Sequence, residues 1–342
     1  MNKSIYLDMN IFLCLKKKEE FHNEVMDKIK FLKGQGFIFP YSPAHMEEIA
    51  IPLRDRFTRD IIKNISFVDK ELQLIANISD NWEFLPGNMR EEDVYNLFEA
   101  NNNTYSNSFL PSQEKLMFEE YLRDLPFIIK YHGEDIFKTQ LKQEHPKECM
   151  KRVIEQYPKT QFAEDNDTLI LGRKNDNVLE KTVKMLDLDS NYNYYLERTH
   201  DKVRKKYNIF PEVINNISPW ELLSDNNIKN LFNDRFNGTL DNLSIENVKN
   251  HYRKCDVFSI FFNCLEEAGY KAEKIKYDKK KNELTKIKSR MHDVTHAIYG
   301  FEANYFISDD SRFIDKFKVL ANFFESDIKI MSIEEFLAFD FV

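Results

Sequence analysis

Carboxylates follow short apolar segments at both ends of this sequence. Near the start, Ile5-Tyr6-Leu7 is typical of a buried strand, and Asp8 follows it directly. Near the end, Tyr305-Phe306-Ile307 has the same character and is followed by Ser308-Asp309-Asp310. Because the carboxyl ends of parallel strands meet at one edge of an α/β sheet, we expect these acids to lie close together.

Two helix-like segments carry acids that could join this group. Glu47 and Glu48 lie in the first segment, and Asp293 lies in the second. Clustered carboxylates repel one another unless a cation joins them, and Mg²⁺ and Mn²⁺ take oxygen ligands. Such cations activate water and stabilise the leaving oxygen in phosphodiester hydrolysis. The pattern therefore predicts a metal-dependent nuclease.

The elements that would position the first acids form a β-α-β-α opening. Apolar spacing predicts a strand over residues 3–8, a helix over 11–33 and a second strand over 37–41. Ser42 is a natural N-cap for a helix that runs from Pro43 to about Ile51. This order is typical of a parallel sheet covered by helices.

The α/β pattern resumes after residue 285. A helix carries Asp293, a strand covers 305–307, and a helix covers 311–323. A final strand over 328–331 precedes Ser332, which can cap a last helix. We therefore expect an α/β fold whose central parallel sheet is flanked by helices and built from both chain ends.

The middle of the chain has a different, mainly helical pattern. No alternating β pattern is visible from about 55 to 250, and residues 84–88 are predicted to form a loop. We assign residues 1–55 and 285–342 to one domain and residues 56–284 to a mainly α-helical insertion. Its helix-like stretches lie near 55–78, 91–100, 112–130, 147–156, 177–206 and 243–270.

In order, four segments of the sequence resemble the motifs of the PIN domain family, a group of Mg²⁺- or Mn²⁺-dependent ribonucleases. The matching segments are Asp8 with Asn10 two residues later, Glu48 in the helix after Ser42, Asp293 in Asp-Val-Thr-His-Ala, and Ser308-Asp309-Asp310 followed by Phe313. Ser308 stands where the family usually has Thr, which keeps the hydroxyl. The resemblance is confined to the two chain ends and says nothing about the insertion.

The resemblance implies roles for these residues. The metal-binding and catalytic acids would be Asp8, Glu48, Asp293 and Asp310, and the cofactor would be Mg²⁺ or Mn²⁺. Residues that orient waters or carboxylates around them would be Asn10, Ser308 and Asp309. Which of the adjacent acids Glu47 and Glu48 is the ligand stays open, and so does the choice between Asp309 and Asp310. The activity would be hydrolysis of RNA phosphodiester bonds by an endoribonuclease.

Charge is unevenly distributed along the chain, whose net charge is −8. Residues 271–290, directly before Asp293, hold nine Lys or Arg and three acids. Such a stretch is typical of a solvated helix face or of a phosphate-contacting surface. The candidate RNA-binding side chains are Lys279, Lys280, Lys281, Lys286, Lys288 and Arg290. The expected partner is RNA, structured or tRNA-like RNA included. A second copy of the chain or an inhibitor protein would be the other candidates.

Other functions fit the sequence less well. His292 and His296 share a helix face with Asp293 between them, but an HD-type phosphohydrolase needs upstream His and Asp ligands that are not paired here. A phosphatase with Asp8 as nucleophile would need a second Asp where Asn10 stands. An inactive PIN-like module that binds protein or RNA remains the alternative to a nuclease.

The sequence also bears on the cellular compartment. None of the four cysteines forms a CxxC pair, so they are expected to be reduced and mostly buried. No apolar run approaches the roughly 20 residues that a membrane helix needs, and no signal-peptide pattern is visible. We therefore expect a cytoplasmic protein that does not bind membranes.

Overall fold

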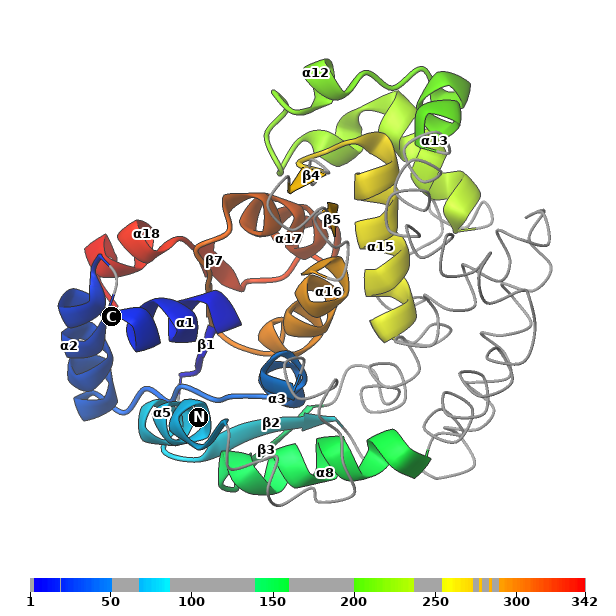
Figure 1. Ribbon diagram of the computed structural model, residues 1–342. Coiled ribbons are helices and arrows are strands. Elements are labelled where there is room, and N and C mark those ends of the chain that lie inside the picture. Colours follow the sequence, from blue (N-terminus) through cyan, green and yellow to red (C-terminus); the bar gives the residue numbers. More distant parts are fainter. Residues whose placement is uncertain are drawn as a thin grey trace, which may run out of the picture.

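The computed structural model describes nine ranges of the chain, shown in colour in Figure 1: residues 3–18, 20–50, 68–86, 139–159, 200–236, 254–272, 277–278, 283–284 and 289–341. The elements up to residue 159 are β1 (Ile5–Leu7), α1 (Met9–Lys17), α2 (His22–Gly34), α3 (Pro43–Ala50), α5 (Asp69–Ser79), β2 (Trp82–Pro86), β3 (Thr139–Gln143) and α8 (Pro146–Lys159). The later elements are α12 (Pro211–Ile214), η3 (Leu222–Ser224), α13 (Asn226–Arg235), α15 (Lys254–Ala268), β4 (Tyr277–Asp278), β5 (Glu283–Leu284), α16 (Ser289–Gly300), β6 (Tyr305–Ile307), α17 (Ser311–Phe323), β7 (Lys329–Met331) and α18 (Ile333–Ala338).

The central sheet joins the two ends of the chain. Its strands are all parallel and lie in the order β1-β6-β7, with Tyr6 opposite Phe306 and Phe306 opposite Ile330. On the free side of β1, Ser4 forms a parallel bridge with Ile38. The predicted α/β class and the parallel sheet built from both ends are therefore confirmed.

Alternating side chains of the sheet enter two hydrophobic cores, one on each face. The first core cluster contains Ile5 and Leu7 and is covered by α1, α2, α5, α8 and α18. The second core cluster contains Tyr6 and Phe306 and is covered by α13, α15, α16 and α17. In Figure 1, α1, α2 and α18 lie on one side of β1 and β7, and α13, α15, α16 and α17 lie on the other. Described residues from the middle of the chain thus belong to both cores.

The predicted helix over 11–33 is wrong in one respect, because two helices occupy this region. α1 ends at Lys17, and its C-cap Lys18 has a left-handed backbone (φ 55°) and an N–H that donates to the carbonyls of Cys14 and Leu15. Phe21 is also left-handed (φ 66°) and starts α2. The reversal lets both helices place apolar faces on the first core cluster. Apolar periodicity continues across such a short break and does not reveal it.

The expectation of no β structure in the middle of the chain is also wrong. β2 and β3 form an antiparallel ladder, so residues 84–86, predicted as loop, are part of a strand. Tyr41 bridges Glu83 of β2, and the buried Glu83 accepts two hydrogen bonds from Arg152 of α8. Glu83 is thus a charged residue at a buried position of the strand, which hides the alternation of polar and apolar residues from which a strand is predicted.

The predicted strand over 37–41 is reduced to isolated bridges. Ile38 pairs with Ser4, and Tyr41 pairs with Glu83. Pro40 lies between them and has no N–H for a continuous ladder. The segment still runs along both sheets and leads into α3, which begins at Pro43 as predicted.

The C-terminal elements agree closely with the sequence predictions. α17 covers the predicted residues 311–323, with the Asp310 carboxylate accepting N–H groups of its first turn. Ser332 and Glu335 form a capping box at the start of α18. The predicted helices at 91–100 and 112–130 lie outside the described residues. Within the described ranges, no helix combines the length and apolar character needed to cross a bilayer.

Candidate metal centre

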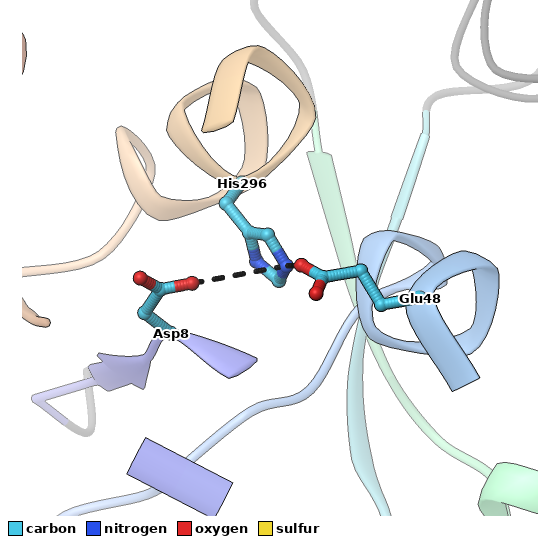
Figure 2. A group of neighbouring side chains, drawn as sticks. All are labelled: Asp8, Glu48 and His296. Carbon is cyan, nitrogen blue, oxygen red and sulfur yellow. Dashed lines mark hydrogen bonds and ion pairs between the residues drawn. The ribbon is translucent and has the colours of Figure 1, made fainter. Parts of the chain in front are cut away.

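Three side chains from distant segments converge at the carboxyl end of the sheet (Figure 2). Asp8 directly follows β1, Glu48 lies on α3, and His296 lies on α16. Their potential ligand atoms all lie within 4.8 Å of one another. His296 Nε2 is 2.8 Å from Glu48 Oε1 and 3.9 Å from Asp8 Oδ1. In the part of the chain that the structure describes, this is the group of acids and histidines that could hold an ion.

Hydrogen bonds hold the Asp8 carboxylate in a fixed orientation. Its Oδ2 accepts from Ser308 Oγ at 2.7 Å and from Asn10 Nδ2 at 2.8 Å. Its Oδ1 accepts from the Met9 N–H at 2.7 Å, because Asp8 is also the N-cap of α1. The same Oδ1 faces His296, so one carboxylate oxygen is anchored on the sheet edge and the other is presented to the group.

Burial makes the negative charges of this group costly. It raises the pKa of Asp8 to about 6, an effect that His296 partly offsets and Glu48 increases. Burial also raises the pKa of Glu48, with His292 opposing the shift and Glu47 adding to it. The buried Asp8 and the half-buried Glu48 are therefore short of positive charge around one imidazole, and a divalent cation would supply it.

A buried hydrogen-bond network supports the histidine from behind. The Tyr6 hydroxyl lies 2.9 Å from His296 Nδ1 and 2.6 Å from Ser42 Oγ. His45 completes the network, with its Nδ1 3.3 Å from Ser42 Oγ and its Nε2 2.8 Å from the Leu7 carbonyl. Tyr6, Ser42, His45 and His296 are all essentially inaccessible to solvent. The network ties α3 and α16 to β1 at the candidate site.

Several residues lie where the sequence predicts them. Asp8 and Glu48 are brought together, and it is Glu48 rather than Glu47 that belongs to the group. Asn10 and Ser308 both contact the Asp8 carboxylate, as expected of residues that orient it. Asp309 is exposed, and its N–H donates to Asn10 Oδ1 at 3.1 Å.

The remaining predicted ligands are outside the three-residue group. Asp310 caps α17 through the N–H groups of Arg312 and Phe313, and its N–H donates to Ser308 Oγ. Asp293 is half-buried on α16, one helical turn before His296. Their roles as ligands stay predictions.

The predicted RNA-binding side chains cannot be placed. Lys279, Lys280, Lys281, Lys286 and Lys288 lie outside the described residues, and of Arg290 only the backbone, within α16, is described. The short pair β4 and β5 falls within the same basic stretch. The interpretation of residues 271–290 as an RNA-contacting surface stays a prediction.

His296 is the member of the group that sequence reasoning did not assign as a ligand. Its pairing with His292 at helical spacing was the available signal, but that spacing occurs on many helix surfaces. Which side of α16 faces the acids depends on how the helix packs on the second core cluster, and packing is not visible in a local motif.

Comparisons of the chain with models of protein families, with curated proteins and with solved structures find no match. The PIN-like assignment therefore stays a prediction that rests on the four sequence motifs. The arrangement of Asp8, Glu48 and His296 is a candidate metal centre on the chemistry of its donor atoms.

Proposed function

We propose that this protein is a divalent-metal-dependent endoribonuclease. The observation that carries the proposal is the convergence of Asp8, Glu48 and His296 at the carboxyl end of a parallel sheet. Asp8 and His296 are almost 300 positions apart in the sequence, and each of the three residues is held by a different element. This edge is where open α/β sheets place their ligands.

The donor set fits a Mg²⁺ or Mn²⁺ ion. Carboxylate oxygens are the ligands that these cations prefer, and imidazole is compatible with Mn²⁺. The raised pKa values of Asp8 and Glu48 support the same conclusion, because a cation would offset the cost of a buried and a half-buried negative charge. When bound, such an ion lowers the pKa of a water molecule and stabilises the oxygen that leaves a phosphodiester.

The residues of the chain would hold and orient this chemistry. Asn10 and Ser308 fix the Asp8 carboxylate on the sheet edge, which limits its rotation away from the ion. His296 and Glu48 would complete the protein side of the shell. Asp293 and Asp310 are candidates for a wider shell, since one lies a turn away on α16 and the other is linked through Ser308.

Two sequence features support RNA as the substrate. The basic stretch 271–290 runs directly into the helix that carries His296, which would bring phosphates towards the acids. The PIN-like motifs imply a ribonuclease. Cys14, Cys149 and Cys264 are buried, as reduced structural thiols usually are, and we propose the cytoplasm.

Cleavage of a mixed RNA pool tests the proposal. Wild-type protein is incubated with Mn²⁺, with Mn²⁺ plus EDTA, and beside the variants Asp8→Asn and Glu48→Gln. We expect cutting with Mn²⁺ alone and its loss in both variants. Asp27→Asn is the matched control, because this exposed aspartate on α2 pairs only with Lys30 among the residues described and should cut normally.

An unchanged cleavage rate in Asp8→Asn would show that the proposed centre is not responsible for the activity. If folded wild-type protein neither cuts RNA nor binds Mn²⁺, the alternative of a catalytically inactive binding module is favoured. In that case the contact between His296 and Glu48 would serve as an internal ion pair.

A further inference from the structure

The imidazole of His296 points towards the two acids of the candidate metal centre. Its side chain is about 1% exposed, and Nε2 is directed towards Asp8 and Glu48 (Figure 2). A buried imidazole between two carboxylates has two simple uses: it can be an ion-pair partner, or it can bind the same cation as they do.

The distances in the group fit a shared ion. In an octahedral shell with bonds of about 2.1 Å, neighbouring ligand atoms are about 3.0 Å apart and opposite ones about 4.2 Å. The separations from His296 Nε2 are 2.8 Å to Glu48 and 3.9 Å to Asp8. The three atoms could therefore surround one cation with small side-chain movements.

The identity of the donors favours one class of cation. Imidazole nitrogen suits first-row transition metals, whereas Mg²⁺ and Ca²⁺ are bound by oxygen. We propose that His296 binds the metal through Nε2 and makes this centre select Mn²⁺ over Mg²⁺. The inference rests on the proposed metal-dependent nuclease and adds the ligand and the metal preference to it.

The network behind His296 supports this role, because it sets the position of the ring hydrogen. The Leu7 carbonyl can only accept, so the hydrogen of His45 is on Nε2 and its Nδ1 is an acceptor. The Ser42 N–H can only donate, so His45 Nδ1 carries no hydrogen and the ring is neutral. His45 Nδ1 accepts from the Ser42 N–H at 3.1 Å and has Ser42 Oγ at 3.3 Å.

One arrangement gives a hydrogen to each contact of the network. Ser42 Oγ donates to His45, Tyr6 donates to Ser42 Oγ, and the Tyr6 oxygen accepts from His296 Nδ1. His296 then carries its hydrogen on Nδ1, and the Nε2 lone pair is available to a metal. A hydrogen shared by Nε2 and Glu48 would be released to solvent when the cation binds. Tyr6 is thus a positioning residue for His296.

Binding selectivity tests the inference. Apparent dissociation constants for Mn²⁺ and Mg²⁺ are measured separately by calorimetry on wild-type protein and on His296→Gln, which puts an amide oxygen near the position of Nε2. We expect wild-type protein to bind Mn²⁺ at least about tenfold more tightly than Mg²⁺, and the ratio to fall about tenfold or more in His296→Gln. His145→Gln is the control, since this histidine caps α8 outside the group.

Pulsed electron paramagnetic resonance of the Mn²⁺-loaded protein identifies the ligand directly. Coordinated imidazole produces a ¹⁴N modulation, which we expect in wild-type protein and not in His296→Gln. The wild-type spectrum decides the question even if the variant fails to fold. Tyr6→Phe should lower the preference for Mn²⁺ over Mg²⁺ in binding affinity about tenfold or more, because the hydrogen of His296 is then no longer held on Nδ1. Tyr41→Phe, which loses a buried hydroxyl bonded to Glu83, should leave the ratio unchanged.

The outcomes separate this inference from the nuclease itself. Mn²⁺ binding without ¹⁴N modulation, together with an unchanged ratio in His296→Gln, would overturn the role of His296 while Asp8-dependent cleavage could still stand. Absence of any cation binding would overturn both. A ratio that falls in His296→Gln and not in Tyr6→Phe would show that the network does not position the ligand.

Discussion

Replacing Asp8 with Asn should stabilise the metal-free protein at neutral pH and abolish its response to metal. Asp8 is 6% exposed, and burial raises its pKa from an ordinary 3.8 to about 6. The folded protein therefore holds this proton more tightly than the unfolded chain does. The contribution of Asp8 to the free energy of unfolding is therefore most favourable below about pH 4, and it decreases by about 3 kcal/mol in all as the pH rises through about 6.

The asparagine variant does not carry a buried negative charge at neutral pH, but it loses hydrogen bonds. Its amide group can still accept from the Met9 N–H, whereas its NH₂ group would face the Asn10 amide that donates to Asp8. That mismatch and the altered Ser308 contact cost about 1–2 kcal/mol. We expect a net gain of about 1–2 kcal/mol at pH 7.5 in EDTA, from the difference between these two contributions.

Metal should reverse the order of stability. At a Mn²⁺ concentration of about 100 times the dissociation constant, a bound ion stabilises wild-type protein by about 2.7 kcal/mol. The variant should gain little. Urea unfolding at pH 4.5, 6 and 7.5, with EDTA and with Mn²⁺, measures these differences. The reasoning is refuted if Asp8→Asn is less stable in EDTA at pH 7.5 and the difference from wild type does not change with pH.

Three further substitutions test how the core and the helices that hold the site are built, each by urea unfolding. Lys316→Met removes the cation that lies 2.7 Å from Glu266 inside the second core cluster, and it should lower the free energy of unfolding by about 3–5 kcal/mol. The double variant Lys316→Met/Glu266→Leu should recover much of this loss, because it leaves no unpaired charge. A double variant as unstable as the single one would contradict this reasoning. Gly300→Ala puts a Cβ 2.4 Å from the Phe306 ring and should cost about 1–3 kcal/mol, whereas a neutral effect would mean that α16 can move off the sheet. Ser332→Ala removes the capping box of α18 and should cost about 1 kcal/mol, and no loss would show that the cap is not stabilising.

The chain ends could be predicted because their signals are local. Apolar triplets directly before Asp8 and Ser308 indicated buried strands, and parallel strands bring their carboxyl ends to one edge. The cap at Ser332 depends on residues three positions apart. Asn10 and Ser308 were placed beside Asp8 correctly, since each lies within three residues of a strand end.

The remaining features depend on contacts between distant segments. The roll of α16 places His296 against Asp8, and it is set by packing on α3 and α15 rather than by the motif around Asp293. β2 was missed because Glu83 is buried by Arg152, so a charged residue stands at an inward position. Polar groups that are satisfied only by tertiary partners do not give an alternating sequence pattern.

Anomalous diffraction from crystals grown with Mn²⁺ tests the central claim most directly. The account predicts a peak at the manganese edge bounded by Asp8 Oδ1, Glu48 Oε1 and His296 Nε2. No peak at this position at millimolar Mn²⁺, or a peak at Asp310 that leaves these three side chains in mutual contact, would contradict it.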